Sequence, residues 1–315
     1  MTTNSRGFRD IDHQPTPPGL KVVILGDSFM EATQVEIAQG FPALLADQLS
    51  RSLEGPLEAI NLGVAGFGTL QETLAYAVEG SRYRPRLVLL GFYLDNDLAD
   101  NSEEITRKLP GLYPRPYLMD GILVPGNYQQ ALRAFDEALA HEREWRLFTL
   151  ARSAFPPPPP EERWTEQEAL MAKYSAYECV ESPMVTRAWD TTSRIFDRLK
   201  RTVEADGARL AVFSIPSKLE IDTRYRNTKE EGRLAALCIS DPPAWHRLAS
   251  LLLERRIPFL DLRSAFRNAE RRSDGPDLYL ATDEHWSVDG HALAADFVAD
   301  AIRDGGLISK PESRR

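Results

Sequence analysis

Cysteine and histidine are scarce in this 315-residue chain, which limits the chemistry open to it. The two cysteines, Cys179 and Cys238, lie too far apart to form a local metal-ligand pair. The sequence does not decide whether they pair with each other, and we expect free thiols. The five histidines lack the neighbouring Cys, His or carboxylate spacing of a metal centre, and no glycine-rich phosphate loop is present. We therefore expect no metal and no cofactor.

Long apolar runs and excess positive charge are also missing. No stretch is long and apolar enough to span a bilayer, and the first 20 residues are too polar for a signal peptide. The net charge of −9 argues against a nucleic-acid partner. We expect a chain that is soluble as given and cytoplasmic by default, with the alternative that it is a fragment of a longer exported or anchored protein.

The hydrophobic pattern alternates between the strand and the helix period. Apolar, β-branched runs predict strands at 21–26, 59–62, 87–93, 209–215 and 257–262. Amphipathic patterns predict helices at 41–53, 69–79, 187–204, 243–255 and 288–303. Strands that alternate with helices predict an α/β fold with a doubly wound, five-stranded parallel sheet.

The alternation is interrupted between residues 102 and 186, a segment much longer than a crossover needs. It contains helical patterns at 128–155 and 165–177, separated by the five prolines of 156–160, which favour a stiff polyproline spacer. We expect one domain over 1–315 in which 102–186 is a helical, proline-rich insertion after the third strand. The insertion either caps the site or is a helical hairpin away from it.

The first predicted strand runs directly into Gly26, Asp27 and Ser28. Open α/β sheets place their ligands at the carboxyl ends of their strands, so Ser28 is a candidate nucleophile. A serine needs a base that takes its proton and an acid that orients the base, and the segment from Asp283 to His285 offers both. The alternative role for Ser28 is a helix N-cap.

Four segments together resemble the SGNH (GDSL-type) hydrolase superfamily: Gly26–Ser28, Asn61–Gly66, Asn96–Asp97 and Asp283–Trp286. The resemblance implies the flavodoxin-like SGNH hydrolase fold, with Ser28 as nucleophile and His285 as base. It also implies an oxyanion hole formed by Ser28, Gly66 and Asn96. The opening segment from Asn4 to Asp10 resembles the one that precedes the nucleophile strand in many bacterial members, and the sequence gives it no mechanistic role.

Two positions depart from the family pattern. Asp95 stands where a glycine usually precedes the Asn-Asp pair, and we expect its carboxylate to face away from the oxyanion hole. Thr282 occupies the usual position of the catalytic acid, so we assign that role to Asp283. Side chains two apart in an extended segment share a face, which would bring Asp283 to His285. The alternative acids are Asp277, Glu284 and Asp289. The resulting D-x-H-W block resembles the SGNH-like domains of alginate and related polysaccharide O-acetyltransferases.

The predicted function is a serine-dependent carboxylester hydrolase that forms an acyl-enzyme on Ser28, with a small-molecule or carbohydrate ester as substrate. The first alternative is an O-acyltransferase that uses the same residues to move an acetyl group to a carbohydrate or metabolite hydroxyl. The second is a binding module without catalytic activity, against which Ser28, Asn96 and His285 argue. We regard His291, on the last predicted helix, as structural.

Overall fold

The computed structural model describes residues 2–15, 19–53, 55–106, 108–109, 115–119, 122–124, 165–228, 234, 236–271, 275 and 277–308. The predicted helices at 128–155 and the prolines at 156–160 lie outside the described residues. Within the part that is described, no helix is long and apolar enough to cross a membrane.

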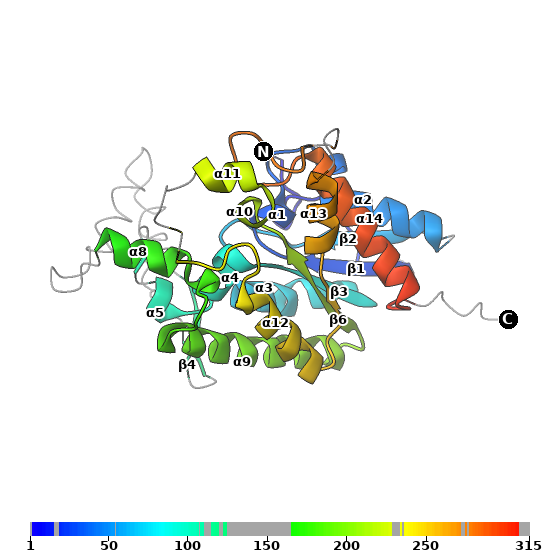
Figure 1. Ribbon diagram of the computed structural model, residues 1–315. Helices are drawn as coiled ribbons and strands as arrows, with labels where there is room; N and C mark the ends of the chain where they lie inside the picture. Colours follow the sequence, from blue (N-terminus) through cyan, green and yellow to red (C-terminus); the bar gives the residue numbers. More distant parts are fainter. Residues whose placement is uncertain are drawn as a thin grey trace, which may run out of the picture.

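A five-stranded, wholly parallel sheet organises the chain (Figure 1). Its order is β2-β1-β3-β6-β7, which confirms the predicted doubly wound α/β fold. The strands are β1 (Leu20–Leu25), β2 (Leu57–Asn61), β3 (Leu87–Tyr93), β6 (Arg209–Ile215) and β7 (Phe259–Leu260). The last strand is much shorter than the predicted 257–262, because only two of its residues pair with β6.

The helices cover both faces of the sheet (Figure 1). Alternate residues of β1 point to opposite faces. Val23 and Leu25 join a hydrophobic cluster with residues of α3 (Thr69–Val78), α9 (Pro183–Ala205) and α12 (Pro243–Glu254). Val22 and Ile24 join a second cluster with residues of α2 (Phe41–Ser52), α13 (Arg263–Glu270) and α14 (Val288–Asp304).

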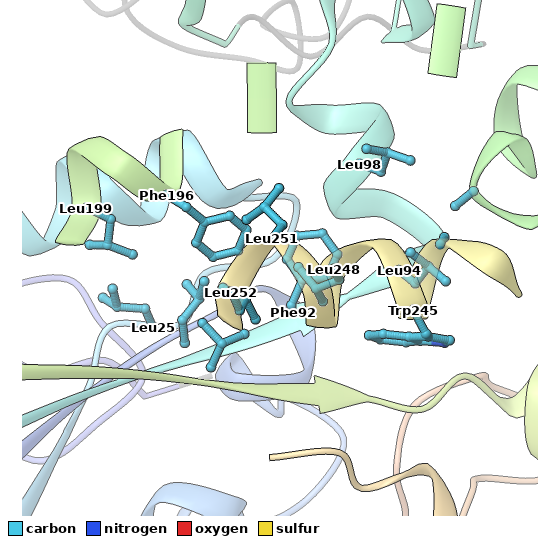
Figure 2. Close-up of a cluster of buried hydrophobic side chains, with 14 of the residues drawn as sticks. Leu25, Phe92, Leu94, Leu98, Phe196, Leu199, Trp245, Leu248, Leu251 and Leu252 are labelled. Carbon is cyan, nitrogen blue, oxygen red and sulfur yellow. The ribbon is translucent and has the colours of Figure 1, made fainter. Parts of the chain in front are cut away.

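Large aromatic side chains fill the first cluster. Figure 2 shows Phe92 of β3 beside Phe196 of α9 and Trp245 of α12. Ring centroids lie 6.0 Å apart for Phe92 and Phe196 and 6.5 Å apart for Phe92 and Trp245, and all three side chains are fully buried. Burial of such a side chain contributes roughly 1.5–3 kcal/mol. This packing fixes β3, whose carboxyl end leads into the site.

The described parts of 102–186 are mostly short elements. They are α5 (Glu103–Thr106), an antiparallel hairpin of β4 (Tyr117–Met119) and β5 (Ile122–Val124), α8 (Glu166–Lys173) and the 3₁₀ turn η4 (Ser175–Tyr177). The helical pattern at 165–177 thus corresponds to α8 and η4, whereas the hairpin was not predicted. Tyr177 is buried in the first cluster. We therefore propose that this segment is part of the same domain.

The expectation of free thiols is wrong, because Cys179 and Cys238 form a disulfide. Sequence distance concealed the pairing. Directly before Cys179, Glu178 forms a β-bridge with Leu237, and the Cys238 amide donates to the Tyr177 carbonyl at 2.8 Å. The disulfide thus fastens the end of the 102–186 segment to the loop that leads to α12.

Candidate active site

The carboxyl ends of β1, β2 and β3 bring three of the four motif segments together. Directly after β1 comes the one-turn helix α1 (Ser28–Glu31), which begins with the candidate nucleophile. Its N-cap is Asp27, whose carboxylate accepts a hydrogen bond from the Phe29 amide at 2.9 Å. Ser28 is therefore not the N-cap, and its half-buried hydroxyl is available for other contacts.

His285 lies between Ser28 and Asp283. Its Nε2 atom is 2.7 Å from Ser28 Oγ, and its Nδ1 atom is hydrogen-bonded to Asp283 Oδ1. The two partners thus contact opposite nitrogens of one imidazole ring, although 257 positions separate Ser28 from His285 in sequence. This is the arrangement required of a nucleophile, a base and an acid that orients the base.

The prediction that an extended segment brings Asp283 to His285 is wrong, although the two side chains do meet. Residues 281–285 form a bend in which Asp283 Oδ1 also accepts the His285 backbone amide at 3.0 Å. This local turn, typical of aspartate, brings the two side chains together. Burial acts to raise the pKa of Asp283, but hydrogen bonds from His285 and from the Gln34 side chain hold it below its usual value. Sequence reasoning missed Gln34.

Packing holds the loop that carries His285. The Leu280 amide donates to the His285 carbonyl at 3.0 Å, and Tyr279 forms a β-bridge with Trp286. Trp286 is fully buried, and its ring centroid lies 5.2 Å from that of Phe29 in α1. The Phe29 ring also contacts the His285 imidazole, at 4.9 Å between centroids. The imidazole is therefore packed on the helix that begins with Ser28.

The three alternative acids contact residues other than His285. The Glu284 carboxylate accepts a hydrogen bond from the Tyr225 hydroxyl. Asp289 is exposed in the first turn of α14, and Asp277 accepts the Ser287 hydroxyl through its backbone carbonyl at 2.5 Å. Of the candidate acids, Asp283 has the hydrogen bond to His285.

Gly66 lies in a tight turn after β2. The Phe67 amide donates to the Val64 carbonyl at 3.1 Å, and Gly66 has a φ of +78°. This φ suits the third residue of a type II turn, a position that favours glycine. The turn lies against α1, because the Ala65 amide donates to Glu31 Oε2 at 2.8 Å. An added Cβ at Gly63 would be 2.4 Å from Met30 Cβ, so the approach requires glycine there.

Asn96 lies in α4 (Leu94–Asp100), the helix that follows β3. Its side-chain Nδ2 donates to Asp27 Oδ2 at 3.0 Å, which ties it to the residue that precedes Ser28. An amide nitrogen carries two hydrogens, so one remains for a second acceptor. Burial raises the pKa of Asp27 to about 6, although hydrogen bonds from Phe29 and Asn96 oppose the rise.

Asp95 is held by two tyrosines. Its carboxylate accepts the Tyr93 hydroxyl at 3.2 Å and also accepts the Tyr177 hydroxyl. Tyr177 Oη lies 3.0 Å from Ser217 Oγ, so the bonds link α4 to the segment after β6. Burial raises the pKa of Asp95 to about 6.

Two buried carboxylates, on α3 and α4, were not anticipated. Glu72 of α3 is fully buried, and among the described residues neither of its oxygens has a hydrogen-bond partner. Asp97 Oδ2 accepts the Tyr93 amide at 2.7 Å. Burial, together with the charges of neighbouring carboxylates, raises the pKa of both groups well above the usual values.

His291 is a structural histidine, as predicted for its helix position. It is buried in α14, and its Nδ1 accepts the Phe41 amide at the start of α2 at 3.3 Å. Burial lowers its pKa to about 4, so it stays neutral. In the described residues, no group of three or more His, Cys, Asp or Glu side chains is placed to hold a metal ion.

Residues 174–314 match the model of the SGNH hydrolase-like domain of the acetyltransferase AlgX, and this range includes Asp283 and His285. No match was found among curated proteins.

Solved structures with a similar fold include esterases and lipases of low sequence identity. The acetyl xylan esterase AlAXEase is 14% identical with a TM-score of 0.46, over 90% of this chain and 100% of that one. A catalytic mutant of the acetylxylan esterase Axe2 from Geobacillus stearothermophilus is 13% identical with a TM-score of 0.46, over 96% and 100%. The lipase/acylhydrolase from Enterococcus faecalis is 14% identical with a TM-score of 0.40, over 94% and 100%. At these scores the likeness carries no argument about activity.

Residues 174–314, a little less than half of the chain, therefore match an SGNH hydrolase-like domain, and the order of the parallel sheet agrees with the predicted fold. This match supports an enzyme of the esterase or acyltransferase type.

Proposed function

We propose that this enzyme cleaves small acyl esters, acetyl esters of carbohydrates above all, through an acyl-enzyme on Ser28. The observation that carries the proposal is the continuous contact from Ser28 Oγ to His285 Nε2 and from His285 Nδ1 to Asp283. A chain of this kind lets a neutral imidazole take the serine proton while the carboxylate stabilises the imidazolium that forms.

In the first half-reaction, Ser28 Oγ attacks the ester carbonyl carbon as its proton moves to His285 Nε2. The carbonyl oxygen becomes an oxyanion, which accepts hydrogen bonds from the backbone amides of Ser28 and Gly66 and from the Asn96 side chain. Each such donor typically contributes about 100- to 1000-fold in rate. The tetrahedral intermediate collapses, the bond to the alcohol oxygen breaks, and His285 gives its proton to the leaving alkoxide.

In the second half-reaction, water attacks the acyl carbon and His285 accepts a proton from it. The bond to Ser28 Oγ breaks, the proton returns to the serine oxygen, and the carboxylic acid leaves. Asp283 stays ionised throughout, in keeping with its lowered pKa. The chemistry of these steps is fully supplied by the side chains and amides named here.

Hydrolysis of p-nitrophenyl acetate, butyrate and octanoate by the intact protein and by Ser28→Ala tests this proposal. We expect turnover of the acetate ester to fall at least about 1000-fold in the variant, with unchanged thermal unfolding. The dependence of kcat/KM on acyl length then measures the size of the acyl pocket. Equal activity of the two proteins would refute a mechanism through Ser28.

Transfer of the acyl group to a carbohydrate hydroxyl is the second candidate. It is favoured by the match of residues 174–314 to the AlgX acetyltransferase domain, a range that contains Asp283 to Trp286 of this chain. The same residues serve both reactions, because an acceptor hydroxyl replaces water in the second half-reaction. Partition of the acetyl group between water and an added oligosaccharide, followed by mass spectrometry, distinguishes them. Acetylated oligosaccharide as the main product would favour transfer.

A further inference from the structure

The one-turn helix α1 and the residues that follow it lie against all three parts of the candidate site. Its first residue, Ser28, contacts His285. Its last residue, Glu31, accepts the Ala65 amide next to Gly66. Three positions further on, the Gln34 side chain helps to lower the pKa of Asp283. The course of the chain from Ser28 to Val35, here called the nucleophile turn, thus sets the distances among nucleophile, acid and oxyanion loop.

The nucleophile turn is weak by itself. A single helical turn has little intrinsic stability. The turn also contains Ala32 with a φ of 52°, in the left-handed region. For a residue other than glycine, this conformation costs about 1–2 kcal/mol. The geometry therefore needs support from outside the turn.

Arg9 supplies that support. Its Nη1 donates to the carbonyls of Glu31 at 2.9 Å and Ala32 at 2.7 Å, and its Nη2 donates to the carbonyl of Val35. The guanidinium thus binds three carbonyls on both sides of the strained residue. A planar group with donors in a fixed fork can do this, whereas the ammonium of lysine is a single point of contact.

The N-terminal strap, residues 4–13, holds Arg9 in place through contacts that do not involve the nucleophile turn. Asp10 Oδ2 accepts the Asn61 backbone amide at 2.7 Å. At the other end of the strap, Arg6 forms a two-bond ion pair with Glu79, with nitrogen–oxygen distances of 2.9 and 2.5 Å. The strap is therefore docked on the end of β2 and on the end of α3 through contacts that the Arg9 side chain does not make.

We infer that Arg9 is a positioning residue for the proposed reaction: its guanidinium fixes the nucleophile turn, and thereby the alignment of Ser28, His285 and Asp283. This inference rests on the proposed function of Ser28. Loss of the guanidinium lets the turn relax, and misplacement of reacting groups by about 1 Å lowers rates by about 100-fold. The segment from Asn4 to Asp10, for which the sequence suggested no role, then serves the site.

The first test compares Arg9→Ala, Arg9→Lys and the matched control Arg6→Ala in hydrolysis of p-nitrophenyl acetate. We expect Arg9→Ala to lower kcat about 100-fold, with KM changed by less than about threefold, and Arg9→Lys to recover only part of the loss. Arg6→Ala removes a partly exposed arginine from the same strap without touching the nucleophile turn. The contacts of Asp10 with Asn61 and of His13 with Glu58 keep the strap docked, so the kcat of this variant should stay within about threefold. Equal losses in Arg9→Ala and Arg6→Ala would refute the inference in favour of a general effect of strap docking.

Chemical rescue distinguishes a positioning role of Arg9 from a merely structural one, because an added guanidinium compound should restore the rate only in the first case. Arg9 lines a surface cavity of about 780 Å³ together with Gln34 and Val35, so a small cation can reach its place. Ethylguanidinium should partly restore the rate of Arg9→Ala and leave Arg6→Ala unchanged. If ethylguanidinium does not restore activity and Arg9→Lys is fully active, the two-pronged guanidinium contact of Arg9 is not what positions the nucleophile turn.

The low-field proton resonance of the bond between His285 and Asp283 separates this inference from the proposed function, since it requires no turnover. We expect the resonance in the intact protein and in Arg6→Ala, and its loss or broadening in Arg9→Ala. An unchanged resonance in Arg9→Ala would overturn the inference. If Ser28→Ala retains full esterase activity, the proposed function fails, and this resonance still decides whether Arg9 aligns the pair.

Discussion

Replacement of Asp283 by Asn tests which carboxylate orients the base. The change keeps the size of the side chain and an oxygen at the position of Oδ1, which accepts both the His285 Nδ1 bond and the His285 amide. Gln34 donates to Asp283, and its own Oε1 is buried without a hydrogen-bond partner among the described residues. A flip of the Gln34 amide would present that oxygen to the new amide nitrogen. The geometry should therefore survive while the negative charge is lost.

The magnitude follows from the charge. A carboxylate and an imidazolium about 4 Å apart attract each other by about 4 kcal/mol at an effective dielectric constant of about 20. The Asp283 side chain is 37% exposed and that of His285 23%, so solvent screens part of this energy. If about two thirds remains, the transition state loses about 2.7 kcal/mol, which corresponds to about 100-fold in kcat.

The assay is kcat and kcat/KM for p-nitrophenyl acetate in Asp283→Asn and in Asp289→Asn. Asp289 is an exposed residue of α14 with the same chemistry, close by in sequence, and its variant should keep kcat within about threefold. Thermal unfolding of both variants monitors folding. If Asp283→Asn stays as active as the intact protein while Asp289→Asn loses about 100-fold, the acid has been misassigned.

Two further predictions concern stability. Burial raises the pKa of Glu220 from 4.5 to about 8, so the folded state keeps a proton that the unfolded chain releases above pH 4.5. The free energy of unfolding should therefore fall with rising pH, by at most about 5 kcal/mol up to pH 8. In denaturant titrations from pH 5 to 9, Glu220→Gln should lack this part of the slope, and parallel curves would contradict the shift. The double variant Cys179→Ser, Cys238→Ser opens a loop with a sequence separation of 59, which should cost at most about 4 kcal/mol. Mass spectrometry after alkylation should find no free thiol in the unreduced protein. Two alkylated thiols would disprove the bond, and with it the argument that the protein works in an oxidising compartment rather than in the cytoplasm.

The candidate site was predictable where its residues carry a local signal. Ser28 follows a β-branched strand, and His285 stands beside an acid in a recognisable block. Gly66 has a backbone conformation that favours glycine, and a glycine-rich run marked the place. These properties depend on a few neighbouring residues. The parallel, doubly wound sheet was predictable for a related reason, since the helix between two parallel strands leaves few ways to connect them.

The contacts that support the site have no such signal. Arg9 and Gln34 are ordinary polar residues in sequence, and each acquires its role from a partner that folding brings close. The pairing of Cys179 with Cys238 is likewise set by the β-bridge before it, between residues almost 60 positions apart. Pairings of this kind depend on tertiary structure, whereas strand and turn propensities do not. The prediction of free thiols failed for this reason.

The surroundings of α4 should influence the fate of the proposed acyl-enzyme. Asn96 follows Asp95, whose carboxylate is bound by Tyr177 from the end of the 102–186 segment. The disulfide at Cys179 fastens the same end two residues later. The helix α4, which carries the proposed oxyanion residue Asn96, is therefore joined to the end of the segment that the sequence marked as an insertion. We expect changes at Tyr177 or Cys179 to alter the partition of the acyl group between water and a carbohydrate hydroxyl, because these residues hold the neighbour of Asn96 in place.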